Sequence, residues 1–281
     1  MTYFMSRTRR ARCAMPVIAA LAVAACLPLS AGAQSGAERG TAAAIPASGA
    51  DVLERMRSAF DGKWYKTLTF VQTTILHRPD GATTRQTWHE SVRHTTDRGG
   101  QLRIDVGDLA AGNGMLYTAD STWIVRGGRL AAIRPSGNEF LPLIESVYLQ
   151  PVERTVRELS KTRIDMDRVS RGQWRARPVW IVGSTSAADS TRPQFWVDIE
   201  RNVVVRMILR DSDAAPVMDV HLDGYVQTAN AWLGTDVKIH VGGKLVQEEQ
   251  YSDWKTGVEL APSLFDPAQW QSAPHWGRTK K

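Results

Sequence analysis

Cysteine is nearly absent from this 281-residue sequence, which contains only Cys13 and Cys26. Both lie within the first 26 residues, so the rest of the chain has no thiol for a disulfide or a metal ligand. His89 and His94 mimic a zinc-protease motif, but they are five residues apart and cannot face one metal from a helix or a strand. We therefore predict no metal site and no cofactor.

Signatures of several enzyme classes are also missing. The sequence has no Gly-x-Ser-x-Gly elbow, no Walker phosphate loop and no EF-hand spacing. Gly112-Asn113-Gly114 lacks the third glycine and the following helix of a dinucleotide site. Strand and helix patterns do not alternate, which argues against Rossmann-type and TIM-type folds. The sequence consequently does not predict an enzyme.

The amino terminus has the pattern of an export signal. Four arginines lie among the first 12 residues, followed by the apolar run Ala14–Leu27 and the triplet Ala31-Gly32-Ala33. This run is shorter than the roughly 20 residues that span a bilayer as a helix. A basic start, a short apolar segment and an A-x-A site are typical of a secretory signal peptide. We predict a signal peptide over residues 1–33, cleaved between Ala33 and Gln34, and a periplasmic protein.

A second interpretation of this segment stays open. Val23-Ala24-Ala25-Cys26 resembles a lipobox, the site at which bacterial lipoproteins are cut and lipidated on cysteine. Lipidation of Cys26 would make the protein an outer-membrane lipoprotein instead.

The excess of positive charge belongs mostly to the same segment. The whole sequence has 35 Lys and Arg against 29 Asp and Glu, a net charge of +6, but residues 1–33 hold four arginines and no acid. Without them the net charge is about +2. This balance gives no support to a nucleic-acid partner. The hydrophobic fraction of 43% is typical of a folded globular protein.

The rest of the chain reads as one domain with short extensions. Residues 34–48 have the Ala, Gly, Ser and Pro composition of a flexible linker. Ser48 and Asp51 form a capping-box pattern, which predicts a helix over residues 49–61 with one apolar face. We predict a single β domain over residues 49–270 and a C-terminal tail over 271–281.

Most of this domain consists of strand patterns with turns every 8–12 residues, which favours an antiparallel meander. Arg201-Asn202 and Gly242-Gly243 occupy positions suited to two-residue hairpin turns. The predicted strands are Thr67–His77, Thr84–Thr96, Gln101–Val106, Gly114–Ala119, Thr122–Arg126, Arg129–Arg134, Gln173–Thr185, Pro193–Glu200, Val203–Arg210, Val217–Val226, Thr235–Val241 and Lys244–Tyr251.

Residues Glu139–Ser160 interrupt the strand series. Apolar residues recur at helical spacing on both sides of Pro151, which predicts two short helices. The pair of helices either packs into the core or forms a movable cover over a cavity.

The tryptophan residues allow two interpretations as well. All ten tryptophans lie beyond residue 63, where they either fill the core or line a cavity for apolar ligands.

Four segments resemble a known bacterial family. They are the helix and strand over 51–75, the paired strands Gly114–Arg126, the strand, turn and strand Pro193–Arg206, and Lys244–Phe265. Together they make residues 50–270 similar to the lipoprotein-carrier superfamily of LolA-like and LolB-like proteins. The resemblance implies a mainly β fold, an incomplete (unclosed) antiparallel β-barrel with an N-terminal helix and a short-helix lid.

The resemblance also implies a function without covalent chemistry. A hydrophobic cavity under the lid would hold the acyl chains of lipoproteins or lipids in a periplasmic carrier, which acts as a monomer. An inner-membrane release complex or an outer-membrane acceptor would be its partner. The alternatives are an envelope sensor or regulatory module of the same fold and, if Cys26 is lipidated, an outer-membrane acceptor.

Candidate ligand-binding residues follow from strand alternation, which places every second side chain on the inner face. On the strands they are Leu68, Phe70, Trp123, Trp180, Val182, Phe195, Val197, Val205, Met207, Val220, Leu222 and Ile239. On the lid they are Phe140, Leu143, Ile144 and Val147.

Overall fold

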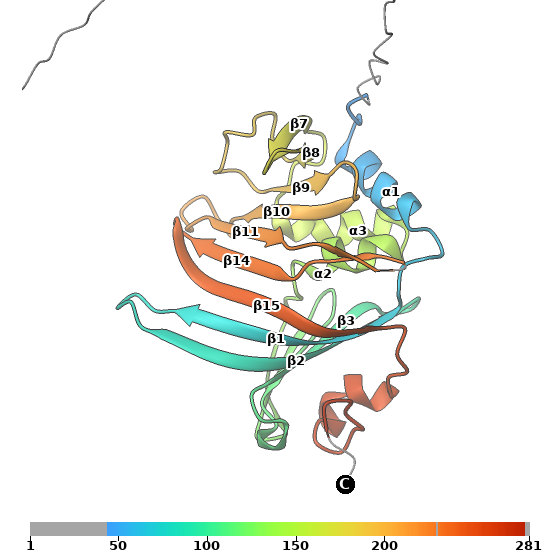
Figure 1. The fold of residues 1–281 in the computed structure, drawn as a ribbon, viewed down its shortest axis with the longest axis vertical. Helices are drawn as coiled ribbons and strands as arrows, with labels where there is room; N and C mark the ends of the chain where they lie inside the picture. Colours follow the sequence, from blue (N-terminus) through green and yellow to red (C-terminus); the bar gives the residue numbers. More distant parts are fainter. Residues whose placement is uncertain (1–43, 229, 279–281) are drawn as a thin grey trace, which may run out of the picture. The chain divides into compact units, whose positions relative to one another are not determined.

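The computed structural model describes residues 44–228 and 230–278. The predicted signal peptide, its cleavage site and Cys26 lie outside the described residues. One antiparallel sheet dominates the described chain (Figure 1). Its strand order is β6-β5-β4-β3-β2-β1-β15-β14-β11-β10-β9-β8-β7. The two ends, β6 and β7, do not pair with each other within the described chain, so the sheet is not closed. The predicted fold class, a mainly β unclosed antiparallel sheet with few short helices, is confirmed.

The strands of the large sheet are β1 (Thr67–His77), β2 (Thr83–Thr95), β3 (Gly99–Val106), β4 (Gly114–Tyr117), β5 (Thr122–Arg126), β6 (Arg129–Arg134), β7 (Val169–Trp174), β8 (Arg177–Val182), β9 (Gln194–Asp198), β10 (Val203–Leu209), β11 (Met218–Asp223), β14 (Asp236–Val241) and β15 (Lys244–Thr256). A separate two-stranded ribbon joins β12 (Val226–Gln227) to β13 (Trp232–Leu233). Because β1 pairs with β15, the first and last strands of the chain lie side by side in the middle of the sheet.

Of three turns that can be compared with the sequence-based predictions, one agrees with its prediction and two differ. Gly242 and Gly243 have φ of 56° and 77° and form the expected two-residue turn. The single strand predicted over 173–185 is wrong, because Arg175 and Ala176 adopt φ of 48° and 64° and turn the chain between β7 and β8. A two-residue turn is rarely built without Gly or Asn, so residues 175–176 do not indicate a turn by their type. The turn predicted at 201–202 is instead a four-residue loop over 199–202, since Val203 pairs with Asp198.

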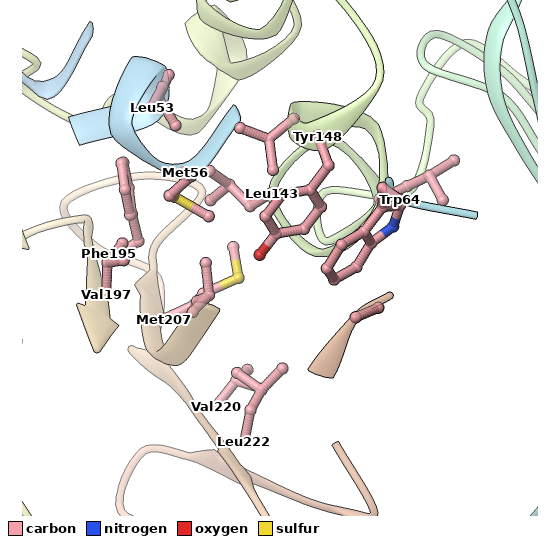
Figure 2. Close-up of a cluster of buried hydrophobic side chains, with 14 of the residues drawn as sticks. Leu53, Met56, Trp64, Leu143, Tyr148, Phe195, Val197, Met207, Val220 and Leu222 are labelled. Atoms are coloured by element: carbon pink, nitrogen blue, oxygen red, sulfur yellow. The ribbon is translucent and has the colours of Figure 1, made fainter. Parts of the chain in front are cut away.

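The N-terminal helix forms where its capping pattern predicts it. Helix α1 covers Gly49–Ala59, and the Ser48 and Asp51 side chains each accept a hydrogen bond from the other residue's backbone N–H. Val52, Leu53 and Met56 are fully buried on one face. That face packs toward the sheet, as the buried cluster in Figure 2 shows.

Residues 139–162 form the inserted helical segment. It contains α2 (Leu141–Ile144), the 3₁₀ turn η2 (Ser146–Tyr148), α3 (Val152–Leu159) and the 3₁₀ turn η3 (Ser160–Thr162). This segment and α1 lie together on one face of the sheet (Figure 1). Helix α1 contacts η2 and α3 of the inserted segment. The sheet is contacted by α2, which meets β3 and β10, and by α1, which meets β8. None of the described helices is long and apolar enough to span a membrane.

The other face of the sheet carries two smaller cores. One lies under the C-terminal segment, which includes the 3₁₀ turns η4 (Pro262–Phe265) and η5 (Pro267–Gln269), and it contains the buried Trp270. The turn η1 (Leu109–Ala111) precedes β4. The segment that the sequence suggested as a tail is packed as far as the structure describes it, with Ala273 and His275 buried. The second core surrounds Trp196 on β8–β10.

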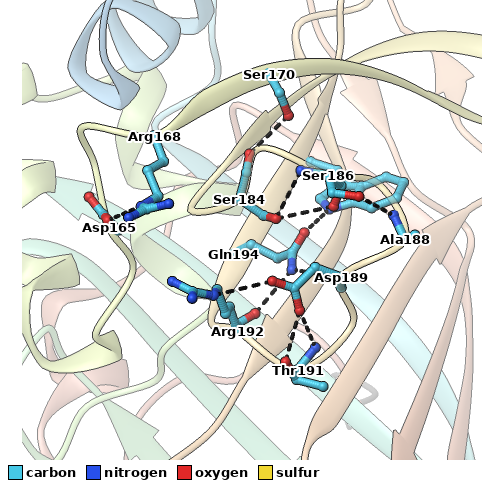
Figure 3. Close-up of polar contacts among 11 residues, drawn as sticks. Asp165, Arg168, Ser170, Ser184, Ser186, Ala188, Asp189, Thr191, Arg192 and Gln194 are labelled. Atoms are coloured by element: carbon cyan, nitrogen blue, oxygen red, sulfur yellow. Dashed lines mark hydrogen bonds and ion pairs between the residues drawn. The ribbon is translucent and has the colours of Figure 1, made fainter.

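The long loop between β8 and β9 is held by its own polar side chains (Figure 3). Ser170 donates its hydroxyl to the Ser184 carbonyl at 2.8 Å, and the Gln194 amide donates to the Asp189 carbonyl at 2.6 Å. Asp189 in turn accepts from the Thr191 backbone and hydroxyl. These local bonds satisfy backbone groups that the sheet leaves free.

Candidate functional site

A cavity of about 380 Å³ lies between the inserted helical segment and the sheet. Strands β1–β4 and β15 form one wall, and residues from β10, β11, β13 and β14 form another. Its lining is Trp64, Tyr65, Phe70, Gln72, Trp88, Glu90, Val92, Leu102, Ile104, Met115, Tyr117, Asn138, Phe140, Leu141, Ile144, Glu145, Tyr148, Val203, Val204, Leu222, Tyr225, Trp232, Leu233, Gly234, Val237, Ile239, Gln247, Glu249, Tyr251 and Trp254. Most of these side chains are aliphatic or aromatic, the composition of sites for apolar ligands.

Aromatic rings hold the inserted segment at one end of the cavity. The Trp64 ring stacks on Tyr148 with 3.7 Å between centroids and an interplanar angle of 22°. Phe60 meets both rings edge-on at 4.9 and 5.3 Å. Trp64 and Tyr148 appear together in Figure 2, close to Leu143. Offset and edge-on aromatic pairs add favourable energy beyond the area that they bury, so this cluster ties η2 to the chain that leads into β1.

The same end carries a half-buried carboxyl on the inserted segment. Glu145, between α2 and η2, accepts hydrogen bonds from the Tyr65 hydroxyl at 2.9 Å and the Trp64 indole at 3.4 Å. Burial raises the pKa of Glu145 to about 7, although the two hydrogen bonds oppose the rise. A group with this pKa changes charge near neutral pH.

A second aromatic cluster lies across the cavity on β1 and β15. Phe70 stacks on Trp254 with 4.8 Å between centroids and lies 5.1 Å from Tyr251. Tyr251 and Trp254 meet edge-on at 5.5 Å. Asp253 between them has φ of 55°, and the register between β1 and β15 shifts at this point. The bulge allows both rings of β15 to face the cavity.

Two further carboxyls flank this cluster. Glu90 on β2 is only 4% exposed, and its Oε1 atom has no hydrogen-bond partner among the described residues. Glu249 on β15 accepts hydrogen bonds from the Tyr251 hydroxyl and the Gln247 amide. Burial raises the pKa of both groups, and the charge of Glu249 raises that of Glu90 further.

Only part of the sequence-based set reaches the cavity. Phe70, Leu222 and Ile239 on the strands, and Phe140 and Ile144 on the inserted segment, line it. A larger group lies in the same continuous core but does not line the cavity: Leu68, Trp180, Val182, Phe195, Val197, Met207, Val220, Leu143 and Val147. Several of these pack against α1 and η2, as Figure 2 shows for Phe195 and Met207.

Trp123 and Val205 lie away from the cavity. Trp123 packs against the core under the C-terminal segment, and Val205 belongs to the core around Trp196. Register shifts in both hairpins break simple alternation, between Ile124 and Val125 and between Val204 and Arg206. Val204, rather than Val205, therefore faces the cavity.

The residues predicted from the sequence did not include the polar side chains that line the cavity. Trp88, Glu90 and Val92 alternate along β2 and all line the cavity, so period-two alternation contained the signal. The same alternation places Gln247, Glu249 and Tyr251 inward on β15. A search for apolar inward positions passes over such glutamates, because buried carboxyls are rare.

Comparisons with known proteins identify the fold. No family model matches the sequence, and no curated protein matches it. Among solved structures, a domain classed as an outer membrane lipoprotein-sorting protein, from Vibrio parahaemolyticus, has a TM-score of 0.56 at 12% identity, covering 79% of this chain and 97% of that one. A DUF1329 family protein from Desulfovibrio piger has a TM-score of 0.54 at 14% identity, covering 78% and 95%. These two likenesses show that the chain shares their fold, in agreement with the unclosed antiparallel β fold that the sequence resemblance implied.

Proposed function

We propose that this protein is a periplasmic binding or carrier protein that holds acyl chains of lipoproteins or lipids in its cavity, without covalent chemistry. The observation that carries the proposal is the largely aliphatic and aromatic cavity of about 380 Å³ between the sheet and the inserted helical segment. The Vibrio parahaemolyticus domain of the same fold is classed as lipoprotein-sorting, which supports the same ligand class here.

Burial of the acyl chain supplies the affinity. Each methylene moved out of water contributes about 0.8 kcal/mol. A chain that buries about ten methylenes therefore gains about 8 kcal/mol before the cost of ordering it. No bond is made or broken, so the ligand leaves unchanged.

The inserted helical segment acts as the lid in this proposal. Phe140 and Ile144 face the cavity, whereas Leu143 and Val147 are buried in the core. A ligand that enters displaces the first pair from the cavity lining while the second pair keeps the segment attached. Because the lid covers the empty cavity with its own apolar side chains, lid and ligand compete, and this competition limits net affinity and permits release.

Export and transfer complete the proposal. The signal peptide predicted over residues 1–33 delivers the chain to the periplasm, where it acts as a monomer. An inner-membrane release complex or an outer-membrane acceptor exchanges ligand with it.

Lipid analysis of the exported protein tests the function. The protein is purified from the periplasm and examined by native mass spectrometry, then by mass spectrometry of an organic extract. We expect acylated species that copurify and that are displaced by the neutral fluorescent probe N-phenyl-1-naphthylamine. A protein without acylated species that also fails to bind the probe would contradict the proposal.

A further inference from the structure

The charged side chains that line the cavity are all acidic. It contains three glutamates, Glu90, Glu145 and Glu249, and no Lys, Arg or His among the residues that the structure describes there. An anionic head group is held most strongly by Arg or Lys, which form charge-assisted hydrogen bonds with it. This cavity offers the opposite charge.

Glu90 is the clearest part of this arrangement. Its side chain lies on the cavity face of β2, between Trp88 and Val92, and is 4% exposed. Oε1 is buried and has no hydrogen-bond partner among the described residues. Buried polar atoms are nearly always paired in folded proteins. An unpaired carboxylate oxygen in a cavity therefore points to a donor or a cation that a ligand supplies.

Glu249 lies on the same wall. Glu90 on β2 and Glu249 on β15 are separated by β1, which pairs with both strands. Glu90 is opposite Phe70 of β1 and Glu249 is opposite Thr74, so the two glutamates are also offset by four residues along β1, and Gln72 lies between them at the cavity surface. Both side chains face the cavity from the same sheet, and the charge of Glu249 raises the pKa of Glu90.

Aromatic faces surround this space. Phe70, Tyr251 and Trp254 form the stacked cluster on β1 and β15. Trp88 on β2 and Tyr117 on β4 line the cavity near Glu90. Ammonium groups bind over aromatic faces, and quaternary ammonium ligands are held by aromatic cages. Carboxylates and aromatic rings together suit a cationic head group.

We infer that the cavity selects a cationic amphiphile, with an ammonium or trimethylammonium head between Glu90 and Glu249 and an apolar tail that extends toward the inserted helical segment. This inference rests on the proposed function and names its ligand class. The tail contacts Val92, Leu102 and Ile104 along β2 and β3 and then Phe140 and Ile144.

Binding of a cationic head is coupled to the protonation of the two glutamates. Burial raises the pKa of Glu90 and Glu249, and a cationic head placed beside them favours their charged form and lowers the pKa again. Binding then releases protons and strengthens as pH rises. The other titratable groups in the lining are Tyr117 on β4, Tyr251 on β15, and Glu145, Tyr65, Tyr148 and Tyr225 around the inserted segment.

The test compares single-chain amphiphiles that differ only in head charge. Dodecyltrimethylammonium, dodecyl sulfate and neutral dodecanol each displace N-phenyl-1-naphthylamine from the exported protein at pH 7.5, below micellar concentrations. We expect the cation to displace the probe at a concentration at least tenfold lower than the anion, a difference of about 1.4 kcal/mol. The net charge of the chain is positive, so nonspecific attraction would favour the anion instead.

Charge-neutral variants locate the head group. Glu90→Gln, alone and with Glu249→Gln, should remove the preference for the cation and leave dodecanol unchanged. Glu248→Gln is the matched control, because the adjacent Glu248 pairs with His77 and Lys238 rather than lining the cavity. Dodecylphosphocholine, with a phosphate beside its cation, should bind less well than dodecyltrimethylammonium.

The outcomes separate this inference from the proposed function. Equal displacement by cation and anion in the unmodified protein overturns the inference and leaves the carrier proposal standing, and it needs no variant to fold. A preference that survives both glutamate substitutions also overturns it. Failure of the probe and of all amphiphiles to bind overturns the carrier proposal itself.

Discussion

The Tyr65 hydroxyl donates a 2.9 Å hydrogen bond to the Glu145 carboxylate. Tyr65 lies just before β1, whereas Glu145 belongs to the inserted helical segment, so this bond joins the segment to the sheet. Trp64 donates to the same carboxylate at 3.4 Å and stacks on Tyr148 of η2. The attachment of the inserted segment therefore includes one titratable group.

The first prediction is that titration of Glu145 makes the unfolding free energy depend on pH. Burial raises the pKa of Glu145 from 4.5 to about 7. A carboxyl with a raised pKa in the folded state stabilises that state fully below pH 4.5, and this contribution is lost as pH rises through about 7. At about 1.4 kcal/mol per pKa unit, Glu145→Gln should reduce the loss of unfolding free energy between pH 4.5 and 8 by about 1–3 kcal/mol.

Urea denaturation of both proteins from pH 4.5 to 8 checks this prediction. The difference between wild type and variant isolates Glu145 from Glu90 and Glu249, whose pKa values burial also raises. A difference that stays constant across the range would contradict the assignment.

A second prediction concerns the C-terminal segment. Arg103 on β3 is fully buried and donates two hydrogen bonds to Asp105 at 2.6 and 2.7 Å. It also donates to the carbonyls of Leu264 and Trp270, and its guanidinium lies 3.7 Å from the Trp270 ring centroid. Arg103→Met leaves Asp105 buried without this partner, and we expect a loss of about 3–5 kcal/mol in unfolding free energy.

Joining Arg103→Met with Asp105→Leu removes both charges, and most of the stability should return. Chemical denaturation of the single and double variants measures the coupling. If the double variant is as unstable as the single one, loss of packing rather than an unpaired charge explains the effect.

Turn geometry yields a third prediction. Ala176 has φ of 64° in the turn between β7 and β8, a region that costs residues with a Cβ atom about 1 kcal/mol or more. Ala176→Gly should therefore stabilise the protein by about 0.5–1 kcal/mol. Gly243→Ala, at φ of 77° with no atom within 4 Å of the added Cβ, should do the reverse. Thermal denaturation of the pair checks the prediction, and a common sign would contradict it.

These turns also mark the limit of sequence-based prediction for the fold. Alternation and turn residues were enough to place β1, β5 and β6, because each strand ends at Gly, Pro or Asp clusters. Arg175 and Ala176 carry no such signal, so the hairpin between β7 and β8 read as one strand. The pairing of β1 with β15 joins segments far apart in sequence, and no local pattern of residues predicts it.

The cavity was harder to predict for two physical reasons. Bulges on β10 and β15 change which side chains face inward, and a bulge depends on the partner strand rather than on local composition. The inner face is also shared between core and cavity. Phe195 and Met207 are fully buried in the core beside α1, whereas Glu90 lies in the cavity, and only tertiary packing makes that division.

The last prediction tests the lid. Ile144 faces the cavity from the end of α2, so Ile144→Asp places a carboxylate among apolar side chains, in a cavity that already holds Glu90, Glu145 and Glu249. We expect the affinity for N-phenyl-1-naphthylamine and for dodecanol to fall at least tenfold, since each polar group in the cavity reduces the apolar area that a ligand buries. Fluorescence titration measures both affinities.

Ile133→Asp is the matched control, because Ile133 on the edge strand β6 is 57% exposed and lies outside the cavity. It should bind both ligands as the wild type does. Near-ultraviolet circular dichroism shows whether the Ile144 variant keeps its tertiary packing. If it does not fold, Phe140→Ala removes a lid contact without burying a charge, and it should weaken binding severalfold. Unchanged affinity in a folded Ile144→Asp protein would mean that the inserted segment is a plain packing element, as the alternative interpretation of Glu139–Ser160 holds.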